Sequence, residues 1–125
     1  MTIVPGDRYR FEALPGRRSA DPLDGHPPGR SSVRVVVIEP GRRSPHLHPH
    51  SEEVVYVMAG RGQIWIDGAF HPVAPGTCAW IPPSVPHATL ASAGERVELV
   101  CFFPHPDLRA NLQDLPTYVE LNEET

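Results

Sequence analysis

Short runs of alternating or continuous apolar residues, separated by proline and glycine, cover most of the chain. The strongest runs are Val33–Glu39 and Glu53–Met58, and a weaker run spans Arg8–Ala13. The remaining runs are Gln63–Ile66, Ala69–Val73, Thr77–Ile81, His87–Ala91 and Arg96–Phe103. Runs of this length that recur about every ten residues predict an all-β sandwich or barrel.

The turn residues between the runs favour the same fold class. The chain contains 16 prolines and 10 glycines in 125 residues, which leaves little room for long helices. The Asp67-Gly68 pair between two apolar runs predicts a tight β-hairpin. A short helix is predicted only within Pro106–Leu115, because Pro106 and Asp107 could begin one and Pro116 would end it.

The length of the chain fits a single domain with three parts. Residues 1–32 are expected to form an N-terminal strand and arm. Within that part Pro15–Ser32 is polar and rich in proline and glycine, and predicts a long loop, either mobile or wrapped over a neighbour. Residues 33–104 are expected to form the core barrel. Residues 105–125 are expected to pack on the barrel or to be partly disordered.

Charge and apolar content exclude several classes of partner. The net charge is -4, and no basic block stands out, so a nucleic-acid partner is not expected. The apolar runs are too short to cross a membrane. The N-terminus has no apolar core of a signal peptide, and we expect a cytoplasmic protein. Cys78 and Cys101 share no metal or redox spacing, so we interpret them as reduced core residues, with a disulfide as the less favoured alternative.

Histidines are concentrated in the segment Pro45–His50. Side chains at positions i and i+2 of a strand point to the same face, so His46 and His48 are expected to project side by side. Neutral imidazole binds zinc, copper, iron and nickel. Glu53, which begins the next β-rich run, could supply a third ligand, and His87, which begins another run, could complete the set.

Two spaced motifs resemble those of the cupin superfamily. Gly41-x4-His46-x-His48-x4-Glu53-x6-Gly60 resembles the first cupin motif, and Gly76-x5-Pro82-x-Ser84-x2-His87 resembles the second. The resemblance covers about two-thirds of the chain and implies a double-stranded β-helix, or jelly-roll barrel, with one short C-terminal helix as an optional addition.

The resemblance also implies which side chains bind metal. His46, His48, Glu53 and His87 match the four metal positions of the family, and together they would hold one divalent ion. The sequence does not distinguish iron, manganese, nickel, zinc and copper. His50 and Glu52 are not expected to bind, because His50 lies past Pro49 and Glu52 has the opposite strand parity from Glu53.

The chain departs from the family pattern at positions that are not ligands. Ser84 stands at the glycine of the second motif, where a different turn conformation could be needed. Ala91 replaces the usual asparagine, which removes a polar contact. These departures leave the metal prediction intact and weaken the transfer of any one activity.

Several further residues are candidates for contact with a substrate. Val55 shares the inward parity of Glu53, and Thr89 shares that of His87. Arg34 and Gln63 are polar residues inside strands and could orient an oxygen-rich ligand, although a solvent-facing role is the simpler interpretation. The pairs Arg17-Arg18 and Arg42-Arg43 are expected on loops. The predicted substrate-binding set is therefore Arg34, Val55, Gln63 and Thr89.

The resemblance leaves the reaction open, because one fold supports many functions. The family includes dioxygenases, decarboxylases, isomerases and domains that only bind ligands. The favoured hypothesis is a metal-dependent enzyme that acts on a small oxygenated organic molecule, as a dioxygenase or as an isomerase or decarboxylase. The alternative is a non-catalytic small-molecule-binding or sensor domain. A homodimer is expected, because small jelly rolls have open sheet edges that need cover.

Overall fold

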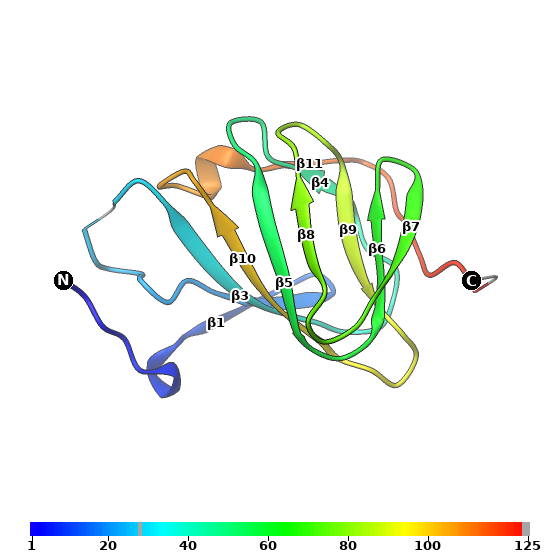
Figure 1. Ribbon diagram of the computed structural model, residues 1–125, viewed down its shortest axis with the longest axis horizontal. Helices are drawn as coiled ribbons and strands as arrows, with labels where there is room; N and C mark the ends of the chain where they lie inside the picture. Colours follow the sequence, from blue (N-terminus) through cyan, green and yellow to red (C-terminus); the bar gives the residue numbers. More distant parts are fainter. Residues whose placement is uncertain (28, 124–125) are drawn as a thin grey trace.

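Two antiparallel sheets form the body of the molecule (Figure 1). The computed structural model describes residues 1–27 and 29–123. The larger sheet contains, in spatial order, β1 (Phe11–Leu14), β2 (Arg17–Ala20), β3 (Ser32–Ile38), β10 (Val97–Phe103), β5 (Glu53–Ala59) and β8 (Cys78–Ile81). The smaller sheet contains β11 (Gln113–Asp114), β4 (His46–Leu47), β9 (His87–Ala91), β6 (Gly62–Ile66) and β7 (Ala69–Val73). The all-β, two-sheet architecture predicted from the apolar runs is confirmed.

The core lies between the two sheets, where the inward side chains of both meet. Residues of β5 and β10 alternate between buried and more exposed positions, as half-buried antiparallel strands do. Val55 is buried, as its parity predicted, Val57 of the same strand is buried beside it, and Leu99 and Phe103 of β10 face the same core. The buried hydrophobic cluster also includes Val36, Ile38, Ile64, Val73, Ile81, Ala91, Val97 and Cys101.

The N-terminal arm is more regular than its sequence predicts. β1 and β2 form a hairpin, and β2 continues the larger sheet by pairing with β3 from Arg17↔Ile38 to Ala20↔Val35. The expectation of a continuous loop over Pro15–Ser32 is therefore wrong at Arg17–Ala20. The segment has a polar sequence with weak β-propensity, and its strand conformation comes from backbone pairing with the exposed edge of β3.

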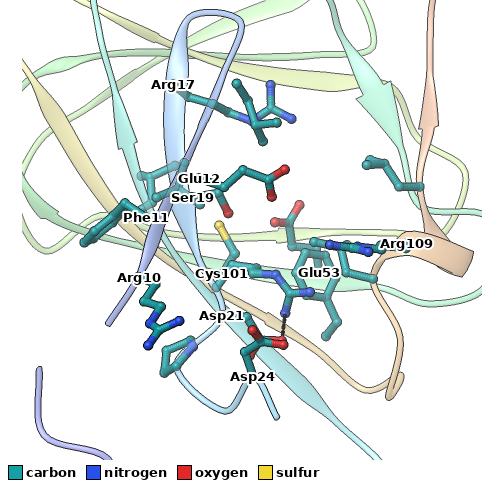
Figure 2. Close-up of a pocket in the computed structure, with 18 of the residues that line it drawn as sticks. Arg10, Phe11, Glu12, Arg17, Ser19, Asp21, Asp24, Glu53, Cys101 and Arg109 are labelled. Carbon is teal, nitrogen blue, oxygen red and sulfur yellow. Dashed lines mark ion pairs between the residues drawn. The ribbon is translucent and has the colours of Figure 1, made fainter. Parts of the chain in front are cut away.

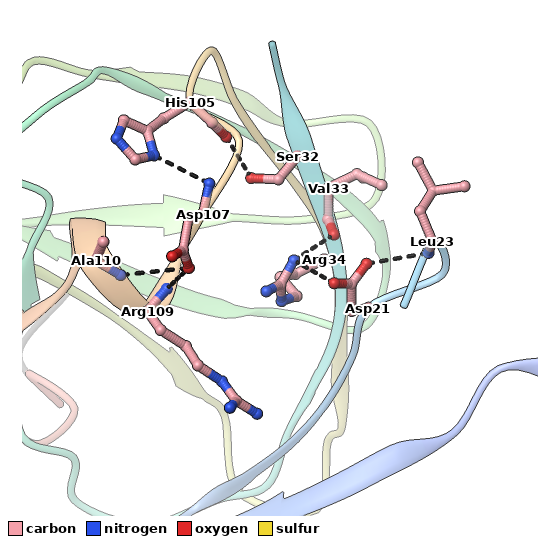
Figure 3. Close-up of polar contacts among 9 residues, drawn as sticks. All are labelled: Asp21, Leu23, Ser32, Val33, Arg34, His105, Asp107, Arg109 and Ala110. Atoms are coloured by element: carbon pink, nitrogen blue, oxygen red, sulfur yellow. Dashed lines mark hydrogen bonds and ion pairs between the residues drawn. The ribbon is translucent and has the colours of Figure 1, made fainter. Parts of the chain in front are cut away.

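The C-terminal part contains one helical turn. Arg109–Asn111 forms a single 3-10 turn, η2, within the stretch where a short helix was predicted. The Asp107 carboxylate accepts hydrogen bonds from the backbone N–H groups of Arg109 and Ala110, at 3.0 and 3.4 Å (Figure 3). A second 3-10 turn, η1, spans Gly6–Arg8. Among the described residues, no helix is long and apolar enough to cross a membrane.

In the part of the chain that the structure describes, two turns place a residue other than glycine in the left-handed region. Asp67 and Gly68, with φ of 47° and 94°, join β6 to β7 in the hairpin that their sequence predicted. Ser84 has a φ of 64°, so the serine adopts the conformation that its glycine equivalent would take freely. Its backbone N–H donates to the carbonyl oxygen of His48 at 2.9 Å, which ties this turn to the histidine segment.

Candidate metal centre

Four side chains from three strands and one loop converge between the sheets. His46 on β4 lies directly opposite His87 on β9, and His48 follows two residues later. Glu53 begins β5 in the other sheet. One potential ligand atom from each of the four residues lies within 4.8 Å of the others. The structure therefore brings together all four residues that the resemblance implied as ligands.

Hydrogen bonds to the backbone orient two of the imidazole rings. Nδ1 of His48 lies 2.8 Å from the carbonyl oxygen of Asn111, and Nδ1 of His87 lies 2.9 Å from the carbonyl oxygen of Val85. A carbonyl oxygen only accepts, so in each ring Nδ1 must carry the proton. The lone pair of the neutral ring is then on Nε2, which faces the cluster.

The atoms that face one another in the cluster are buried without hydrogen-bond partners. Nε2 of His48 and Nε2 of His87 lie 3.3 and 2.8 Å from Oε1 of Glu53, but these close contacts lack hydrogen-bond geometry. Nδ1 of His46 is also buried and unpaired. Buried polar atoms without partners are rare in folded proteins. One imidazole nitrogen from each histidine and one carboxylate oxygen fit a divalent metal ion, which would satisfy the facing atoms of His48, His87 and Glu53 together.

Burial and neighbouring charges shift the protonation of the cluster. Burial, followed by the nearby His87, lowers the pKa of His46 well below its usual value, so this ring is neutral at pH 7. Burial by itself would raise the pKa of Glu53, but contacts from His48 and His87 outweigh it and hold that pKa below its usual range. A neutral imidazole and an ionised carboxylate are the forms that bind metal.

The neighbouring histidine and glutamate point elsewhere. The ring of His50 stacks on His105, with centroids 5.9 Å apart. The carboxylate of Glu52 accepts a hydrogen bond from the exposed indole N–H of Trp80. Neither residue belongs to the four-residue cluster. Strand parity and the proline at position 49 thus predicted which of these side chains lie in the cluster, and metal binding by the four stays a prediction.

A cavity of about 1290 Å³ opens from the cluster toward the N-terminal arm (Figure 2). Of the four residues predicted to contact a substrate, Arg34, Val55 and Thr89 line this cavity together with all four cluster residues. Gln63 does not line it. Its side-chain amide instead bonds both the N–H and the carbonyl oxygen of Asn122, each at 2.9 Å. For Arg34, Val55 and Thr89, contact with a substrate stays a prediction.

Arg34 enters the cavity with a partner of its own. Its Nη1 lies 3.3 Å from Oδ2 of Asp21 and donates to the carbonyl oxygen of Val33 at 3.0 Å (Figure 3). The other carboxylate oxygen of Asp21 accepts from the N–H of Leu23. The loop before β3 thus provides the charge that balances Arg34.

Sequence reasoning missed three residues near the cluster. Asn111 is fully buried and supports His48 through its backbone. Arg17 and Arg43 were expected on loops, but Arg17 lies on β2, Arg43 is buried in a bridge with Val119, and both line the cavity. The repeated Arg-Arg pairs were the available signal, because alternate residues of an extended segment face opposite sides.

One of the two cysteines differs from expectation. Both are free thiols, but only Cys101 is buried, so the prediction of a core position is wrong for Cys78, which is exposed on β8. Cys101 lines the cavity. Burial, together with the charge of Glu53, raises the pKa of the Cys101 thiol well above its usual value, which keeps it protonated.

The family model for the cupin domain matches residues 34–103. The chain belongs to the cupin family. The matched segment begins in β3 and ends with β10, and therefore contains the whole four-residue cluster.

Two curated relatives share part of the chain. Protein SchB from Streptomyces halstedii is 39% identical over 79 residues, which cover 59% of this chain and 57% of SchB. Polyketide synthase CurC from Streptomyces cyaneus is 34% identical over 67 residues, which cover 53% of this chain and 44% of CurC. The matches thus span about half the length of these relatives.

Two solved structures have backbones that superpose on nearly the whole of this chain. The polyketide cyclase RemF from Streptomyces resistomycificus superposes with a TM-score of 0.74 at 21% identity, covering 98% of this chain and 88% of RemF. The nucleoside dehydratase Pac13 from Streptomyces superposes with a TM-score of 0.74 at 14% identity, covering 92% of this chain and 91% of Pac13. Variants of Pac13 have been solved with uridine. At these identities the likeness establishes a shared fold.

Proposed function

We propose that this cupin is a metal-dependent enzyme acting on a small, oxygen-rich organic molecule, with one divalent ion held by His46, His48, Glu53 and His87. The observation that carries the proposal is the set of buried, unpaired ligand atoms at the cavity wall. Leaving such atoms unsatisfied in the core costs free energy, which a bound ion would offset. A site prepared in this way suits a resident ion rather than an incidental one.

We further propose that the reaction is cyclisation or dehydration of a polyketide-like substrate rather than oxygenation. The names of CurC and RemF refer to polyketide synthesis and cyclisation, and Pac13 is a dehydratase. These names support non-redox chemistry on oxygenated carbon chains. A bound divalent ion would supply a Lewis acid that polarises a carbonyl oxygen.

The cavity walls would serve such a substrate in two ways. Val55, Leu99 and Phe103 provide apolar surface beside the cluster, which would pack against a carbon skeleton and exclude water. Glu12 also lines the cavity, as Figure 2 shows. Its carboxylate is a candidate proton acceptor that is separate from the metal ligands.

Elemental analysis of purified variants tests the metal site. We expect severe loss of metal in His46→Ala, His48→Ala and His87→Ala, and weaker binding with altered ion preference in Glu53→Ala, which removes the anionic ligand. His50→Ala and Glu52→Ala are the matched controls and should retain full metal content. Loss of metal in all six variants with intact circular dichroism would contradict this ligand set.

Turnover tests the enzymatic part of the proposal. A linear poly-β-ketone carboxylic acid and its thioester would each be incubated with protein that is metal-free or loaded with Fe(II), Mn(II), Ni(II) or Zn(II), and products would be followed by mass spectrometry. Cyclised or dehydrated product is expected only from loaded wild type, with none from His87→Ala. Saturable binding of the thioester without any product would instead favour the non-catalytic binding role.

A further inference from the structure

Two arginine side chains, Arg17 and Arg43, enter the cavity beside the metal cluster. Each belongs to an Arg-Arg pair, and the other arginine of each pair does not line the cavity. Arg18 lies over the ring of Phe11 at 5.4 Å, and Arg42 lies over the ring of Tyr118 at 4.2 Å. Arg18 and Arg42 thus have aromatic partners, whereas Arg17 and Arg43 both line the cavity.

Arg43 is held in one place by several contacts. Its backbone N–H and carbonyl oxygen bond to Val119 at 2.9 and 2.8 Å. Its Nη1 donates to the carbonyl oxygen of Thr89 on β9 at 2.9 Å. The side chain is only 5% exposed, yet Nε is buried without a hydrogen-bond partner. An unsatisfied donor on a buried, fixed guanidinium is costly unless something else accepts from it.

The hairpin between β1 and β2 brings the second arginine close to the first. A methyl group built on Gly16, the residue before Arg17, would lie 3.5 Å from Cγ and 3.9 Å from Nε of Arg43. Figure 2 shows the Arg17 guanidinium directed into the cavity that Glu53 also faces. Burial, followed by the nearby charge of Arg17, lowers the pKa of Arg43 to about 10, at which it is still a cation at pH 7.

Within residues 1–27 and 29–123, neither arginine forms an ion pair. Asp114 and Glu53 are close enough to attract Arg43. Glu12 lines the same cavity, but among the described residues no carboxylate oxygen lies within 4.0 Å of either guanidinium. Arg34 differs, because Asp21 already balances its charge. Two neighbouring cations that line one cavity therefore have unused hydrogen-bonding capacity for an anion.

We propose that Arg17 and Arg43 form an anion-binding subsite that recognises a carboxylate group of the ligand, next to the metal cluster. The planar fork of a guanidinium matches a carboxylate, and charge-assisted hydrogen bonds are stronger than neutral ones. The inference deepens the proposed function by assigning the substrate class: an organic acid whose carboxylate lies on the arginines while another oxygen reaches the cluster. It rests on the cavity being the ligand site.

Calorimetric titration with benzoate, with benzamide as its neutral analogue, tests the subsite in metal-free and metal-loaded protein. We expect benzoate to bind in both states at least about tenfold more tightly than benzamide, the scale of one charge-assisted hydrogen bond. Arg43→Gln and Arg17→Gln should each weaken benzoate about tenfold and leave benzamide unchanged. The exposed Arg61→Gln is the matched control and should bind like wild type.

Circular dichroism checks that each variant is folded, and Arg17→Gln carries the test if Arg43→Gln is not. Equal binding of benzoate by wild type and both arginine variants would overturn the subsite, as would tight binding of inorganic phosphate with no binding of benzoate. Benzoate binding that requires loaded metal and ignores both arginines would also overturn it while leaving the metal site intact. Arginine-dependent binding by a protein that takes up no metal would support the subsite and refute the proposed function.

Discussion

The imidazole of His48 donates from Nδ1 to the main-chain carbonyl oxygen of Asn111 over 2.8 Å, across 63 positions of sequence. Asn111 is itself fixed by its side chain, which accepts from the N–H of His50 at 2.7 Å and donates to the hydroxyl of Ser51 at 2.8 Å. The C-terminal 3-10 turn and the histidine segment are thereby joined into one unit. This unit determines which nitrogen of His48 is free to bind metal.

Asn111→Ala should weaken metal binding although it removes no ligand. The substitution deletes both side-chain hydrogen bonds and lets the carbonyl that orients His48 move. In metal proteins, loss of a hydrogen bond that orients a ligating histidine lowers the affinity for the metal by about 10- to 100-fold. We expect the dissociation constant of the metal to rise by that factor. Competitive titration against a chromogenic chelator measures it.

Gln113→Ala is the control for the effect of Asn111, because Gln113 is exposed on the same segment. It should leave the dissociation constant unchanged. An Asn111→Ala protein that is folded and binds metal as tightly as wild type would show that the cluster orients His48 without this support.

Metal removal should lower stability without unfolding the protein. The ligands lie on a sheet framework whose hydrophobic core does not include the ion, in contrast to small zinc domains. Saturating metal at 100 times its dissociation constant would stabilise by about 2.7 kcal/mol. EDTA-treated protein should keep its β-sheet circular dichroism at 25 °C and melt at a lower temperature. Loss of the β signal in EDTA would contradict this view.

The stability of the metal-free protein should fall as the pH is lowered from 7 toward 5. Burial holds the pKa of His46 well below 6.5, so below that pH the unfolded chain takes up a proton that the folded chain does not. The free energy of unfolding then decreases by up to about 1.4 kcal/mol per pH unit for this group. Over this range Glu53 stays ionised in the folded state, because its pKa is also lowered.

Denaturant titrations at several pH values measure this slope. His46→Asn should show a smaller slope than wild type, and the exposed His71→Gln should leave it unchanged. An identical slope in His46→Asn would assign the pH dependence to other groups.

The homodimer predicted from the sequence remains a prediction, and we propose a face for it. Tyr56 on β5, Trp80 on β8 and Phe102 on β10 are exposed on one side of the larger sheet. Phe102 and Trp80 both pair in register with Val54, which makes the patch continuous across three strands. Exposed aromatic patches of this kind mark interaction surfaces.

Light scattering at tens of micromolar should give twice the monomer mass for wild type and the monomer mass for Trp80→Arg. Leu23→Arg is the control, because Leu23 is an exposed apolar residue outside this face. A monomeric wild type would refute the dimer, and a dimeric Trp80→Arg would place the interface elsewhere.

The sequence by itself determined the strands of the core and the identity of the cluster. Apolar alternation is a local property, so runs such as Val33–Glu39 could be placed within about two residues of β3. The parity of His46 and His48 is also local, and with the two family motifs it singled out Glu53 and His87 among the other acids and histidines. The Asp67-Gly68 turn followed from the backbone conformation that these residues favour.

The tertiary structure decided the features that depend on distant partners. Arg17–Ala20 is polar and becomes a strand because β3 offers it an unpaired edge. Arg43 and Asn111 are polar residues that local patterns assign to the surface. They are buried where Val119 pairs with the backbone of Arg43 and the histidine segment bonds the side chain of Asn111. A polar group can be buried only where the fold brings it hydrogen-bond partners, and these partners are distant in sequence. The local spacing of residues therefore does not predict its burial.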